Sequence, residues 1–204
     1  MTGNLQKDAG GSMSRISEED FKPHMEAAAA GGFAIDPPGY ERLTQWTHIL
    51  MNLLSARKNF EWMRDEPADL GDVDNVVRTQ AYFVAALMAY GRCYASSGPG
   101  IPTLDAKKVY NGSADGMEVH RRLIELRNTI AAHTDNSDLV RLTLAAKDEP
   151  DRVVIRHLST SALPLDELPD FLEAVAHTEY FVTVSLNKQL NHLETQIGKR
   201  IVLD

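Results

Sequence analysis

The chain has a single cysteine, Cys93, so it cannot form an intrachain disulfide, which fits a reducing compartment. It also has no long hydrophobic run. The longest apolar stretches, such as Ala81–Tyr90, are far shorter than the ~20 residues that cross a bilayer as a helix. The first residues, MTGNLQKDAGG, lack the basic-then-apolar order of a signal peptide. These absences predict a cytoplasmic protein that does not enter a membrane.

Motifs for metals, cofactors and familiar nucleophiles are missing as well. The sequence has no Cys/His zinc spacing, no HExxH, no GxSxG and no dinucleotide-binding glycine pattern. The loop Gly98-Pro99-Gly100 is not followed by the Lys-Ser/Thr pair of a phosphate-binding loop. We therefore expect no metal site and no cofactor.

Positive charge is the minority charge: 21 Lys and Arg stand against 29 Asp and Glu, a formal net charge of −8. Broad non-specific binding of nucleic acid needs a basic surface, so this composition argues against it and leaves room only for a small local patch. The 204 residues, 43% of them hydrophobic, suffice for one domain with a sizeable core. Residues 1–20 are rich in Gly, Ser, Asp and Asn, which predicts a disordered or loosely packed segment before a single helical domain at 21–204.

Hydrophobic periodicity predicts a mainly α protein, a bundle of four or more helices. Between the third and last main helices the period changes to alternation, which predicts a small β-hairpin. Two strands alone are marginally stable, so we expect this hairpin to pack on the bundle. The expected helices span 40–64, 72–95, a third from Ser113 or Asp115 to about 133, and 165–198, with shorter ones at 17–30 and 103–110; the strands span 139–144 and 152–158, with the turn at 147–151.

The second helix is apolar nearly all round and is expected to be the central buried helix. One side of it is small, which would let another helix approach closely. The small residues are Ala81, Ala85, Ala86 and Ala89.

The third helix ends in a group of polar residues whose side chains can reach a ligand. Arg127 and Asn128 are followed, after four further residues, by His133. Two other Arg residues also precede a His at a similar spacing, Arg42 with His48 and Arg152 with His157, but only Arg127 is followed directly by Asn. The spacing alone therefore has little value, and the added Asn is what makes the motif specific.

The run Leu126–His133, LRNTIAAH, resembles the signature of the HEPN superfamily (higher eukaryotes and prokaryotes nucleotide-binding domains). The resemblance implies an antiparallel helical bundle of four or more helices that commonly forms a homodimer, with the Arg and His motifs of two subunits meeting in one cleft. Many members are metal-independent endoribonucleases, among them toxins and defence effectors. A regulatory protein partner and bound RNA or nucleotide are further implied partners.

Carried onto this chain, the resemblance makes Arg127 and His133 catalytic and gives Asn128 a supporting polar role. Tyr110, His120 and Arg121 could line the same cleft. Two alternatives stay open. The chain could be a non-catalytic HEPN-like module that binds nucleotides or proteins, which the acidic charge favours. It could also be an unrelated helical protein in which Arg127 and His133 only complement the negative end of the helix dipole.

Overall fold

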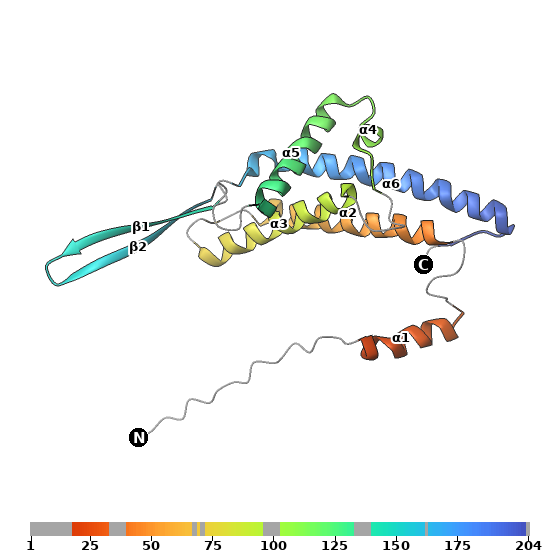
Figure 1. The fold of residues 1–204 in the computed structure, drawn as a ribbon, viewed down its shortest axis with the longest axis horizontal. Coiled ribbons are helices and arrows are strands. Elements are labelled where there is room, and N and C mark those ends of the chain that lie inside the picture. Colours follow the sequence, from red (N-terminus) through yellow and green to blue (C-terminus); the bar gives the residue numbers. More distant parts are fainter. Residues whose placement is uncertain are drawn as a thin grey trace, which may run out of the picture. The chain divides into compact units, whose positions relative to one another are not determined.

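The computed structural model describes residues 18–32, 40–66, 69, 72–95, 103–132, 140–161 and 163–202 (Figure 1). These residues are mainly helical, with one two-stranded antiparallel hairpin between the last two long helices, which confirms the predicted fold class. No helix within the described ranges is long and apolar enough to cross a membrane. The chain divides into two units, residues 1–41 and 42–204.

The first unit contains α1, Glu18–Ala30, in the region where the sequence predicts a short helix. None of its described side chains is buried, so these side chains form no hydrophobic core. Pro23 lies inside the helix, where it removes one backbone hydrogen bond. Residues 1–17 lie outside the described residues, so the predicted boundary after residue 20 stays a prediction.

The second unit contains the remaining helices, and side-chain caps fix where several begin. Asp72 accepts a hydrogen bond from the backbone N–H of Asp74 at 2.9 Å, and Ser113 Oγ accepts one from Gly116 at 3.1 Å. Ser113, rather than Asp115, therefore caps the helix that carries the Arg-Asn motif. The helices are α2 Glu41–Asp65, α3 Val73–Tyr94, α4 Ala106–Val109, α5 Ala114–Ala132, a 3-10 turn η1 Leu165–Glu167 and α6 Leu168–Ile197.

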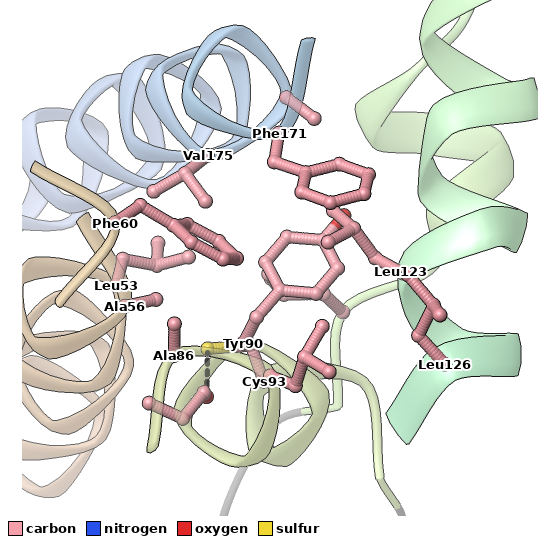
Figure 2. Packing of buried hydrophobic residues seen from close by; sticks show 14 of the residues in the cluster. Leu53, Ala56, Phe60, Ala86, Tyr90, Cys93, Leu123, Leu126, Phe171 and Val175 are labelled. Atoms are coloured by element: carbon pink, nitrogen blue, oxygen red, sulfur yellow. Dashed lines mark hydrogen bonds between the residues drawn. The ribbon is translucent and has the colours of Figure 1, made fainter. Parts of the chain in front are cut away.

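The core lies where α2, α3, α5 and α6 bring their apolar faces together (Figure 2). Phe60 of α2 is fully buried, and its ring centroid lies 6.4 Å from that of Phe83 and 5.7 Å from that of Phe171. Figure 2 shows Tyr90 of α3 among these helices, with Leu123 of α5 beside it. The prediction that α3 is the central helix agrees with its buried face, which includes Phe83, Ala86, Leu87, Ala89, Tyr90 and Cys93.

Only two of the four alanines of α3 that were expected to admit a neighbouring helix are buried. Ala86 and Ala89 are buried at 0% and 5% exposure, whereas Ala81 and Ala85 are exposed. The expectation that all four admit a neighbouring helix is therefore wrong for Ala81 and Ala85. They lie on the other side of the helix, since four positions within nine residues span more than one face.

The hairpin consists of β1, Val140–Glu149, and β2, Arg152–Ser161, with Glu149 paired to Arg152. The predicted turn at 147–151 is wrong in its first part, because β1 continues through Glu149 and only Pro150 and Asp151 form the turn. The carboxylate of Glu149 accepts hydrogen bonds from Lys147 Nζ at 3.0 Å and from Arg152 Nε at 2.9 Å. The contact with Arg152 joins the last residue of β1 to the first residue of β2, where polarity alone indicates a loop.

The hairpin does not bury its described side chains on the helices, so the prediction that it packs on the bundle is wrong for residues 144–156. Leu144, Val153 and Ile155 are 60%, 60% and 58% exposed. The register places all three on one face, because Leu144 is opposite His157 and Ile155 is opposite Ala146. An alternating pattern defines an apolar face, but it does not say what covers that face.

Candidate functional site

Arg127 leaves the last two turns of α5 and runs across α3 at Gly91. A Cβ atom placed on Gly91 would lie 3.1 Å from Cδ and Nε of Arg127 and 3.2 Å from its Cγ. These separations are shorter than the roughly 3.5–4.0 Å of ordinary carbon contacts. A residue larger than glycine at position 91 would therefore have to displace the Arg127 side chain by a few tenths of an ångström.

The polar end of Arg127 is only partly satisfied within the described part of the chain. Nη1 donates a hydrogen bond to Oδ1 of Asn128 at 3.1 Å. Nε is buried and has no hydrogen-bond partner among the described residues. A buried donor without a partner costs about 1–3 kcal/mol, so it requires an explanation, and a catalytic or binding role is one of the recognised ones.

His133 follows Ala132, the last residue of α5, and lies outside the described residues. The predicted pairing of Arg127 with His133 therefore stays a prediction. Asn128 is exposed and accepts this hydrogen bond from Arg127. The supporting polar role expected for it stays a prediction.

Tyr110 and His120, two of the three residues expected beside the motif, are joined through Tyr90. The hydroxyl of Tyr90 lies 2.9 Å from the hydroxyl of Tyr110 and 2.9 Å from Nδ1 of His120. Tyr110 is 3% exposed and His120 is 8% exposed, so both belong to the core. Arg121, the third residue, is exposed on α5.

The hydrogen-bond network continues to α6 and so links α3, α5 and α6 to Tyr110, which directly follows α4. The hydroxyl of Tyr110 donates to the carbonyl oxygen of Ala174 at 3.0 Å and lies 2.9 Å from Oγ1 of Thr178. Tyr94 reaches the same threonine hydroxyl at 2.9 Å. Because Tyr110 uses its proton on α6, Tyr90 can donate to Tyr110, and His120 then carries its proton on Nδ1 and donates to Tyr90.

The sequence analysis did not find Tyr90, Tyr94 and Thr178. Tyr90 and Tyr94 occupy apolar positions of α3, where the helical period predicts only burial. The available signal was chemical, since a buried tyrosine hydroxyl needs a hydrogen-bond partner and two such residues one turn apart need several.

Burial lowers the pKa of His120 below its usual value, and the nearby positive charge of Arg121 lowers it further. Between that lowered pKa and about 6.5, the unfolded chain binds a proton at this site and the folded chain does not. The free energy of unfolding should therefore fall as the pH drops below about 6.5, by up to ~1.4 kcal/mol per pH unit, and gain nothing from this site above it.

Urea unfolding at pH values from 5.0 to 8.0 measures this dependence. His120→Gln should be less stable than the wild type at neutral pH but should lose less stability on acidification. His192→Gln, at an exposed position of α6, is the matched control and should keep the wild-type slope. An unchanged slope in His120→Gln would show that other groups cause the acid sensitivity.

The thiol of Cys93 is not available as a nucleophile. It is 2% exposed in α3, and burial raises its pKa to about 12. Since the thiolate is the reactive form, nucleophilic chemistry at neutral pH does not begin at this residue.

A pocket of about 330 Å³ lies where the start of α5 faces α6, and Tyr110 is one of the residues that line it. The ring of His177 stacks on that of Tyr110 with centroids 5.1 Å apart, and its Nε2 lies 2.9 Å from the carbonyl oxygen of Val109. No group of three or more potential metal ligands occurs among the described residues. Arg127, His120 and Arg121 do not line the pocket. Its lining residues are Tyr110, Ser113, Asp115, Gly116, Val119, Asp170, Glu173, Ala174 and His177.

Comparison with protein-family models, with curated proteins and with solved structures gave no match. The fold is therefore described by its own architecture, a mainly helical unit with an inserted β-hairpin.

Proposed function

We propose that this protein is a HEPN-type, metal-independent endoribonuclease that acts as a dimer. Arg127 and His133 are the catalytic residues, and Asn128 supports Arg127. The observation that carries the proposal is the state of Arg127. Its side chain lies against Gly91, is hydrogen-bonded by the Asn128 of the motif, and has a buried Nε without a partner among the described residues.

The proposed reaction is cleavage of RNA by its own ribose. The 2′-hydroxyl gives its proton to His133, and the 2′-oxygen attacks the neighbouring phosphorus. The bond from phosphorus to the 5′-oxygen breaks, and that oxygen takes up a proton as it leaves. The products are a 2′,3′-cyclic phosphate and a 5′-hydroxyl end. Histidine suits the proton transfers because its pKa lies near neutrality.

Arg127 would stabilise the charge that accumulates on the phosphate oxygens during this attack. A guanidinium offers several N–H donors in a fixed plane, and such donors are most effective when they are held in place before the reaction. The contacts of Arg127 with Gly91 and Asn128 support such a preorganised role. Arg127 lies in the last two turns of α5, and His133 directly follows Ala132, the last described residue of this helix, in the sequence.

Cleavage of a mixed RNA pool in the presence of EDTA tests the proposal. The wild type should cut, and Arg127→Ala and His133→Ala should each reduce the rate by about 100-fold or more, since each removes a group that acts in the transition state. Circular dichroism should show that both variants remain folded. The 5′-hydroxyl and cyclic phosphate ends should be found on the fragments.

Arg42→Ala and His48→Ala are the matched controls. These two residues have the same spacing as Arg127 and His133, but both are exposed on α2 and the Arg is not followed by Asn. They should cut RNA at the wild-type rate. If no protein cuts, or if Arg127→Ala cuts as well as the controls, the ribonuclease proposal fails. A non-catalytic nucleotide-binding or protein-interaction module, which the net charge of −8 favours, is then the better reading.

A further inference from the structure

We infer that Gly91 is a positioning residue for Arg127. Gly91 does not touch the substrate in this proposal. It acts because it lacks a side chain, which lets the Arg127 stem lie directly against the backbone of α3 and fixes where the guanidinium ends. The inference rests on the proposed function only for its effect on catalysis, and its geometric part stands independently.

The backbone conformation at position 91 does not require glycine. It lies inside α3, and it is not among the glycines with a positive φ, which are Gly32, Gly112 and Gly198. A glycine inside a helix is less stable there than alanine. The conformational freedom of glycine is thus not needed at this position, and a close approach is left as the reason.

A side chain at position 91 would meet the side chain of Arg127. The three atoms nearest to a Cβ at Gly91 all belong to Arg127: Cδ and Nε at 3.1 Å and Cγ at 3.2 Å. A methyl group at this position would have to move the Arg127 stem by a few tenths of an ångström. The buried Nε lies in this contact, so the displacement reaches the guanidinium and is not absorbed by an exposed side-chain tip.

A buried hydrogen bond beside Gly91 sets the register of α3 against α5. Tyr90, the residue before Gly91, is hydrogen-bonded to His120 of α5 at 2.9 Å. Arg127 lies seven residues after His120, which is about two helical turns along the same face. The buried hydrogen bond therefore holds the register of α3 against α5 next to Gly91, and a slide of α3 to make room for a larger residue would break or strain this bond.

A double-mutant cycle on thermal stability tests the contact without reference to activity. Gly91→Ala should lower the Tm of the wild type, because the new methyl meets Arg127. In an Arg127→Ala background the same substitution should raise the Tm, because alanine is the better helix former and its obstacle is gone. An equal fall of the Tm in both backgrounds would mean that the methyl meets something other than Arg127, and the inference would be overturned.

A spectroscopic measurement on the full chain tests the positioning itself. The Nε–Hε signal of Arg127 in a ¹⁵N-correlated NMR spectrum is identified by its loss in Arg127→Lys. Gly91→Ala should shift this signal. Val182→Ala, a fully buried position of α6, should lower the Tm through a core cavity and leave the signal in place. A signal that does not move in Gly91→Ala contradicts the inference.

In RNA cleavage, Gly91→Ala should lower kcat by about tenfold and change KM by less than about twofold, since a small misplacement of a group acting in the transition state affects mainly kcat. Val182→Ala, assayed below its Tm, should retain the wild-type kcat. A wild type that does not cut RNA would refute the proposed function, while the stability cycle and the NMR signal would still decide the role of Gly91. A wild type that cuts, together with an unchanged kcat in Gly91→Ala, would refute the positioning role alone.

Discussion

Replacing Phe60 with alanine is expected to lower the free energy of unfolding by about 3–5 kcal/mol, the usual range for a buried phenylalanine. Phe60 is fully buried in α2, and its ring packs against Phe83 of α3 and Phe171 of α6. The substitution removes the side chain through which three helices meet. Neighbouring side chains cannot fill the cavity without leaving their own contacts.

Trp62→Ala is the matched comparison, two residues further along the same helix. Trp62 is a larger side chain, but it is 46% exposed and packs mainly on Tyr82, with ring centroids 5.3 Å apart. Its loss should cost about 1 kcal/mol, because much of its surface already faces water. Urea denaturation of both variants measures the difference. If Trp62→Ala costs as much as Phe60→Ala, the assigned core is wrong.

The second large effect is expected for Tyr110→Phe, which should lower the free energy of unfolding by about 2 kcal/mol although it removes only one oxygen atom. That hydroxyl contacts Tyr90, Thr178 and the carbonyl oxygen of Ala174 inside the core. Without it, buried polar groups on α3 and α6 lose a partner in a site that is 3% exposed.

Tyr180→Phe is the control for this substitution. Tyr180 is 73% exposed on α6, so removal of its hydroxyl should change stability by less than about 0.5 kcal/mol. A cost for Tyr110→Phe as small as that of the control would mean that the buried network is not a significant source of stability. The same urea titrations give both values.

The long helices could be predicted from the sequence, because their apolar residues recur at helical spacing and their ends carry capping residues. The predicted spans 40–64 and 72–95 agree with Glu41–Asp65 and Val73–Tyr94 to within one residue at each end. The predicted helix at 165–198 was resolved into η1 and α6, with Pro169 in the first turn of α6. Period and capping are local properties, so a single sequence contains them.

The structure of the hairpin could be predicted only in part from local sequence patterns. Alternation located both strands, but it placed the turn too early and left the exposed face of Leu144, Val153 and Ile155 unforeseen. Charged residues near the end of β1 look like loop residues, yet Lys147 and Arg152 both bond the carboxylate of Glu149 once the strands pair. Pairing register and the covering of a face both depend on residues distant in sequence.

For the candidate site, the sequence by itself determined which residues stand together in the motif Arg127, Asn128 and His133, and that the first two lie on the last turns of a helix. Only the tertiary structure decided what surrounds them. In the structure, Gly91 contacts the Arg127 side chain and Nε of Arg127 is buried. Tyr110 and His120 are both hydrogen-bonded to Tyr90 in the core. The reason is that contacts between helices depend on how α3 and α5 are packed, and no periodicity within either helix specifies that packing.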